Sequence, residues 1–321
     1  MKLHELKEAF AERSLRHSLS CIEKGDLQAL AALEALGLDK VPKEKRRVVA
    51  EAFYSQAKVL LGKAAFEEAI GSLKLAHTLQ PENHLLAERV SLLQRTEAHC
   101  APVRRRLSLQ NLQRDLAVPC NKRRCECNSH FQIAICQGVI EDSFVHKHTI
   151  HGVIIYTVGP YHSRSHAGKW TKLLKAVKHA PFKAEPLKPM ADILADFIVE
   201  KTPLLGLVDV IVPVPPSPAK FAERGFAPND IVSERLGGRL ALPVRKALVR
   251  KDGISTKEAS DAQLAGQFEV RQSEGRRLAG LSVLLVEDIW TAGRTIPICA
   301  GKLRTFGPKN VYAVALGRTR G

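Results

Sequence analysis

The feature that most constrains the fold is a long apolar stretch that ends in two acids and a short loop. Residues 280–288 are rich in Leu and Val until they reach Glu287 and Asp288, so they predict a buried strand. Residues 296–306 predict a helix, and residues 310–316 predict another strand. Strand, loop, helix and strand form a βαβ unit. We therefore expect an α/β fold with a largely parallel sheet and a right-handed crossover.

Further strands and helices are expected on the amino-terminal side of this unit. Residues 150–158 and 208–216 are rich in β-branched side chains, and the second run ends in prolines, so both predict strands. Residues 169–178, 190–199 and 229–240 predict helices that flank the sheet.

The loop after the two acids has the composition of a phosphate site. A helix N-terminus offers unpaired backbone N–H groups to a phosphate. Thr291 and Thr295 add hydroxyl donors, and the small residues Ala292 and Gly293 let the backbone come close. The two acids stand at the carboxyl end of a strand, where ligands bind in open α/β sheets, and they can accept hydrogen bonds from a cis diol. The pattern predicts a ribose 5-phosphate site.

Residues 283–295 resemble the PRPP-binding signature of type I phosphoribosyltransferases, in which a hydrophobic run, two acids and a Thr/Gly loop follow one another. The resemblance implies a type I phosphoribosyltransferase-like sheet, with Glu287 and Asp288 on the ribose hydroxyls. It also assigns a set of loop residues to the 5′-phosphate: Thr291, Ala292, Gly293, Arg294 and Thr295.

Residues 208–216 and 220–226 resemble the "VPVP … RGF" segment of ComF-like phosphoribosyltransferases, and the resemblance extends over about residues 120–321. It implies that Arg224 approaches the pyrophosphate and that Lys257, in the region of the mobile loop, stabilises the leaving group. The implied function is transfer of a phosphoribosyl group from PRPP, with Mg²⁺ on the pyrophosphate, to an unassigned nitrogen acceptor. The chain would then be a pentosyl glycosyltransferase.

Two segments depart from the ComF-like pattern. Residues 227–230 replace the Asn and Gln that usually follow the Gly-Phe pair, and residues 251–267 contain Lys257 and Gln263 but no Arg. These departures leave open a PRPP fold without catalysis.

Charge supports a second hypothesis. The chain has 49 Lys and Arg against 33 Asp and Glu, a net charge of +16. Residues 1–100 contribute +1, residues 101–200 contribute +7 and residues 201–321 contribute +8. ComF-like proteins are associated with DNA uptake in competent bacteria, so the alternative is a nucleic-acid-associated protein that binds single-stranded DNA. A structural adaptor is a third, weaker hypothesis.

Residues 1–100 are rich in Ala, Leu, Glu and Lys and predict helices. Residues 50–83 resemble one tetratricopeptide repeat, which implies a docking surface for a protein partner; a generic helical bundle is the alternative. Gln56 stands where the repeat usually has Leu. The positions that carry the resemblance are Phe53, Ala57, Leu60, Ala69, Leu73, Ala76 and Pro81.

Residues 101–149 are expected to form a linker and a small Cys-rich segment between the helical region and a phosphoribosyltransferase-like domain at residues 150–321. The candidate ligands of a structural Zn²⁺ are Cys120, Cys125, Cys127 and Cys136, with His130 nearby. Free thiols are the alternative. After the cluster, residues 131–139 predict a strand.

No run of about eighteen uncharged apolar residues occurs, so no membrane span is expected. The charged start of the chain differs from a signal peptide, and a cytoplasmic location is the default expectation.

Overall fold

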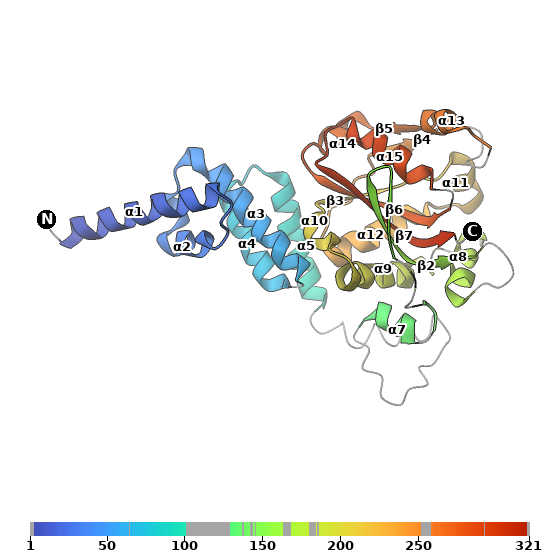
Figure 1. Cartoon of the computed structure of the whole chain (residues 1–321), viewed down its shortest axis with the longest axis horizontal. Helices are drawn as coiled ribbons and strands as arrows, with labels where there is room; N and C mark the ends of the chain where they lie inside the picture. Colours follow the sequence, from blue (N-terminus) through green and yellow to red (C-terminus); the bar gives the residue numbers. More distant parts are fainter. Residues whose placement is uncertain are drawn as a thin grey trace. The chain divides into compact units, whose positions relative to one another are not determined.

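The structure is a computed structural model, and it describes residues 3–63, 65–100, 129–136, 138–141, 144, 146–162, 168–179, 184, 186–251, 258–291 and 293–319. The chain divides into two compact units, Met1–Glu97 and Ala98–Gly321 (Figure 1).

The first unit is helical. Its elements are α1 (Leu3–Glu23), α2 (Ala29–Leu36), two short 3-10 turns (Leu38–Lys40 and Lys43–Lys45), α3 (Arg46–Gly62), α4 (Phe66–Leu79) and the start of α5 (His84–Cys100). No helix in the described part of the chain is both long enough and apolar enough to cross a membrane.

Helices α3 and α4 pack against each other through small and large residues in alternation. Ala57, Ala69 and Ala76 are fully buried, as is Leu73, so the two helix backbones approach closely where a side chain is small. The Ser72 hydroxyl donates to Gln56 Oε1 at 3.1 Å, which gives this polar residue a partner inside the helix pair. Assignment of the pair to the tetratricopeptide family stays a prediction.

The second unit is built on a five-stranded sheet with the order β1-β2-β7-β6-β3. The strands are β1 (Lys147–Ile150), β2 (Val153–Tyr161), β3 (Val210–Pro213), β6 (Ser282–Trp290) and β7 (Asn310–Thr319). The pairs β2/β7, β7/β6 and β6/β3 are parallel, and β1 joins the edge antiparallel to β2. The expected mixed α/β class with a mostly parallel sheet is therefore confirmed.

Helices cover both faces of this sheet (Figure 1). One face packs on α15 (Thr295–Arg304) and on a two-stranded antiparallel sheet of β4 (Leu248–Arg250) and β5 (Phe268–Val270). Val283 and Leu285 of β6 belong to that core, while the alternate residues between them point the other way. The opposite face is covered by α8 (Lys169–His179), α9 (Leu187–Lys201) and α12 (Pro228–Leu240).

The remaining helices are short. They are α7 (His130–Cys136), α10 (Leu204–Leu207), α11 (Pro218–Arg224), α13 (Asp261–Gly266) and α14 (Gln272–Arg276).

One predicted strand is wrong. Residues 131–139 were expected to be extended, but α7 occupies most of this segment. The Ser129 hydroxyl accepts from the Gln132 N–H at 3.1 Å, and Asp196 on α9 accepts from the His130 N–H at 2.7 Å. A short apolar run fits a buried strand and a buried helix equally well, so here the capping contacts select the helix.

Candidate functional site at the carboxyl edge of the sheet

Glu287 and Asp288 lie at the edge of the sheet where the parallel strands end. The last residue of β3, Pro213, pairs with Val286 of β6, so the two acids stand just beyond the end of the neighbouring strand. β6 itself continues to Trp290, which pairs with Arg318 of β7. The sequence placed the loop directly after Asp288; the structure extends the strand by two residues, because Ile289 and Trp290 find partners on β7.

Glu287 is enclosed. Its Oε2 atom is buried and has no hydrogen-bond partner among the described residues. Burial and, after it, the charge of Asp288 raise the pKa of Glu287 to about 8, although Lys220 and Arg250 act in the opposite direction. A buried carboxyl group without a partner is costly, so this position favours a ligand that offers a hydroxyl group or a positive charge.

Asp288 is the more accessible acid, with 27% of its side chain exposed. Its Oδ1 accepts from the Ile289 N–H at 2.7 Å, which fixes the carboxylate, and its Oδ2 lies 3.9 Å from Nη1 of Arg224. Tyr161, the last residue of β2, lies close enough that burial, with the Asp288 charge adding to it, raises the pKa of the phenol. The structure thus brings together the predicted residues Arg224 and Asp288.

Arg224 reaches this edge because α11 is held by local contacts. The Ser217 hydroxyl accepts from the Lys220 N–H at the start of the helix, and Gly225 ends it in a left-handed conformation. The loop between β3 and α11 is tied down by Asn229, whose Nδ2 donates to the Val214 carbonyl at 2.7 Å. Asn229 lies in the 227–230 segment, where the sequence departs from the ComF-like pattern, and it supports the loop that leads to Arg224.

The predicted phosphate loop leads into α15, as a site at a helix N-terminus requires. Gly293 has a φ of +75°, a conformation that favours glycine. Thr291 is exposed and Thr295 is half-buried. Ala292 lies outside the described residues.

Arg294 does not extend freely into the loop. Its Nε donates to Asp261 at 2.6 Å and its Nη2 donates to the Ala259 carbonyl at 2.5 Å. The side chain therefore links the loop to the start of α13. In that helix Gln263 forms a capping box with Ser260, so it supports local structure. Lys257 lies outside the described residues.

A pocket opens beside this loop. We call it the carboxyl-edge pocket; it has a volume of about 360 Å³ and is lined by His148, Thr149, Ile150, Trp290, Thr291, Gly293, Arg318 and Thr319. It joins the tips of β6 and β7 to the edge strand β1.

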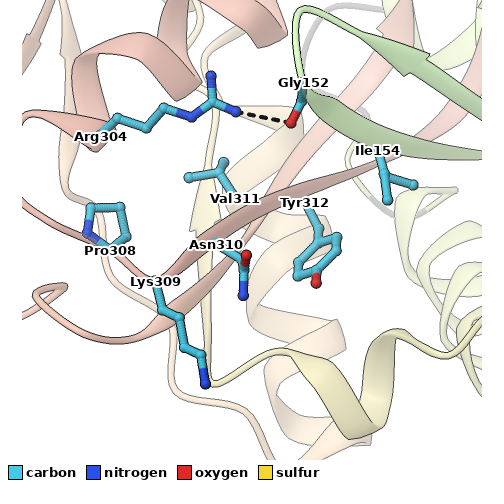
Figure 2. Close-up of a pocket in the computed structure, with 8 residues that line it drawn as sticks. All are labelled: Gly152, Ile154, Arg304, Pro308, Lys309, Asn310, Val311 and Tyr312. Carbon is cyan, nitrogen blue, oxygen red and sulfur yellow. Dashed lines mark hydrogen bonds between the residues drawn. The ribbon is translucent and has the colours of Figure 1, made fainter.

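A second pocket lies at the other end of β7. We call it the amino-edge pocket; it has a volume of about 200 Å³ and includes Arg304, Lys309, Asn310 and Tyr312. Figure 2 shows the hydrogen bond from Arg304 to the Gly152 carbonyl. The distance from Nη2 to the carbonyl oxygen is 3.0 Å. None of the residues predicted to bind PRPP lines this pocket.

The predicted zinc site lies largely outside the described residues, which include neither Cys120, Cys125 nor Cys127. Cys136 is half-buried on α7, and His130 Nδ1 lies 2.7 Å from Asp196. Within the described ranges, no group of three or more His, Cys, Asp or Glu side chains is placed to hold a metal ion.

Several residues of the carboxyl edge were missed by sequence reasoning. Tyr161, Lys220 and Arg250 surround the two acids, while His148 and Arg318 line the pocket. Lys220 lies in the 220–226 segment that the sequence singled out, while Tyr161, His148 and Arg318 stand near the ends of predicted strands. Proximity to these features was the available signal.

No protein-family model matches this chain, and a search of curated proteins finds no similar sequence.

Proposed function

We propose that the chain binds PRPP and transfers its phosphoribosyl group to a nitrogen acceptor. One observation carries the proposal: the carboxyl pair of Glu287 and Asp288 stands at the carboxyl edge of a parallel sheet, one short loop before the N-terminus of α15. A diol acceptor beside a phosphate cradle matches the two ends of a ribose 5-phosphate.

In this proposal the chain acts through position and charge. Asp288 accepts hydrogen bonds from the ribose hydroxyls. Arg224, close to Asp288, stabilises the departing pyrophosphate. The acceptor nitrogen bonds to C1 while the C1–O bond breaks and the pyrophosphate leaves with the electron pair. No covalent enzyme intermediate is needed.

The donor set fits Mg²⁺ bound together with PRPP. Mg²⁺ prefers oxygen ligands and is usually held by one or two carboxylates plus substrate phosphates, and this edge offers the accessible carboxylate of Asp288. When bound, the ion would neutralise charge on the pyrophosphate.

The same proposal gives roles to the other parts of the chain. The sheet would be of the type I phosphoribosyltransferase kind, in a ComF-like protein. The α3/α4 pair would be a tetratricopeptide-like docking surface for a protein partner, and the Cys-rich segment would hold Zn²⁺.

Isothermal titration of the full chain with PRPP and Mg²⁺ tests the proposal. We expect saturable binding with one molecule of PRPP per chain. If the wild-type protein shows no heat of binding with and without Mg²⁺, the proposed function is wrong. A screen of acceptor bases for pyrophosphate release then tests transfer.

The charge distribution favours a second candidate, binding of single-stranded DNA. Nearly all of the +16 net charge falls after residue 100. A mobility-shift titration at several salt concentrations tests it, because binding through phosphate contacts weakens steeply with salt. Salt-independent binding, or none at low salt, would exclude this candidate.

A further inference from the structure

We propose that the carboxyl-edge pocket binds the nitrogen acceptor and that Arg318 selects an acceptor with a carboxylate group. The inference rests on the proposed function, because PRPP must be the donor for an acceptor to exist. It goes further by naming the chemical class that this pocket takes.

Arg318 is held in a fixed position. Its guanidinium carbon lies 4.7 Å from the centre of the Trp290 ring, and its Nη1 lies 2.6 Å from Nδ1 of His148. The same Nη1 lies 3.3 Å from Nε2 of that imidazole, so the guanidinium, which only donates hydrogen bonds, points at the edge of the His148 ring. Nε2 also lies 3.4 Å from the Thr157 hydroxyl, so the ring contacts side chains from two other strands.

The charge of Arg318 has no counter-ion in the described structure. The guanidinium groups of Arg224 and Arg294 lie within 4.0 Å of a carboxylate, but among the described residues no Asp or Glu lies within that distance of Arg318. The planar fork of Arg matches a carboxylate with two parallel hydrogen bonds. An anion from outside the chain would therefore complete this side of the pocket.

The position and size of the pocket fit an acceptor. Thr291 and Gly293 belong both to the pocket wall and to the proposed phosphate loop, so a molecule in the pocket lies next to the loop that would hold the ribose 5-phosphate. A volume of about 360 Å³ is enough for a small heterocycle. His148 and Trp290, with ring centres 5.2 Å apart, form an aromatic part of the wall.

Two pairs of probes that differ mainly in the carboxylate test the inference: nicotinate against nicotinamide, and orotate against uracil. Binding is measured by titration into the full chain preloaded with ribose 5-phosphate and Mg²⁺. We expect the carboxylated member of at least one pair to bind about tenfold or more tightly, as a charge-assisted hydrogen bond permits. Equal affinities within both pairs, or no binding by either acid, overturn the inference.

The variant Arg318→Met keeps the length of the side chain and removes the charge. We expect the carboxylate preference to fall to less than about threefold, with PRPP affinity unchanged within about twofold. Lys309→Met, in the amino-edge pocket, is the matched control and should keep the full preference. Thermal unfolding of each variant verifies the fold, and Arg318→Lys, which retains charge without the fork, provides a second variant.

The outcomes separate the two proposals. If PRPP binds but the probes show no preference, only the acceptor inference fails. If Arg318→Met loses PRPP binding while remaining folded, Arg318 serves the donor, and the acceptor inference is wrong. If the wild-type chain fails to bind PRPP, the proposed function fails first and the acceptor role fails with it.

Discussion

The two ends of the same parallel sheet differ in chemistry. At the carboxyl edge, Asp288 faces Arg224 and Tyr161, Glu287 feels the charges of Lys220 and Arg250, and a glycine-containing loop leads into α15. At the amino edge, the pocket contains Arg304 and Lys309 but no acid among its lining residues. Both ends are basic, but only the carboxyl edge places acids beside its basic groups. Positive charge by itself therefore does not identify the site; its combination with the two adjacent carboxyl groups does.

The largest expected effect is at Asp288. Asp288→Asn retains the shape of the side chain but removes the negative charge that would strengthen its hydrogen bonds from the ribose hydroxyls. We expect PRPP affinity to fall by about a hundredfold or more, since two charge-assisted hydrogen bonds are weakened. Glu269→Gln, an exposed acid on β5, is the control and should bind as the wild type does. Retention of affinity in Asp288→Asn would show that the carboxyl edge is not the donor site.

Glu287 should give the sheet a pH-dependent stability. Its pKa is about 8 in the folded chain, against an ordinary value of 4.5 in the unfolded chain. Between pH 4.5 and pH 8 the folded state therefore binds one more proton than the unfolded state. The stability that this protonated carboxyl group contributes is lost as the pH rises towards 8. Relative to Glu287→Gln, the wild-type protein should lose up to about 1.4 kcal/mol of unfolding free energy per pH unit in this window.

Denaturant unfolding of both proteins from pH 5 to pH 9 measures this difference. A constant difference across the range would mean that Glu287 ionises normally and is not enclosed.

A smaller effect is expected at Gly293. Gly293→Ala places a Cβ about 3.2 Å from Ile150 Cδ1 at a φ of +75°. The left-handed conformation costs about 1–2 kcal/mol for a residue with a Cβ, so we expect a lower melting temperature and weaker PRPP binding. The control is Gly301→Ala on α15, where a Cβ meets nothing within 4 Å and should be neutral or slightly stabilising. Equal melting temperatures and equal PRPP affinities of the two variants would mean that the loop does not require glycine at position 293.

The smallest effect is expected at the amino edge. Arg304→Met removes hydrogen bonds to the His151 and Gly152 carbonyls at an exposed position. We expect a loss of about 1 kcal/mol or less in unfolding free energy and no change in PRPP affinity. A large loss of PRPP binding would mean that the two ends of the sheet act together and that the contrast between them is wrong.

The amino-acid pattern predicted the βαβ unit well because each element has a local signature. The apolar runs that became β3, β6 and β7 are buried on both faces, so they need no alternation to be recognised. Helix α15 could be recognised because a Thr- and Gly-containing loop separates it from the strand before it. The α7 segment failed because seven residues are too few to distinguish the helical period from a strand.

The sequence by itself determined the order of the elements around the loop and the candidate acids, since these depend on neighbours along the chain. Only the tertiary structure decided what surrounds them. Tyr161 and Arg224 reach Asp288 from β2 and α11, and Arg318 reaches His148 across 170 positions of the chain. Such contacts depend on strand order and register, which place the ends of β2, β6 and β7 at one edge, and no local pattern contains that information.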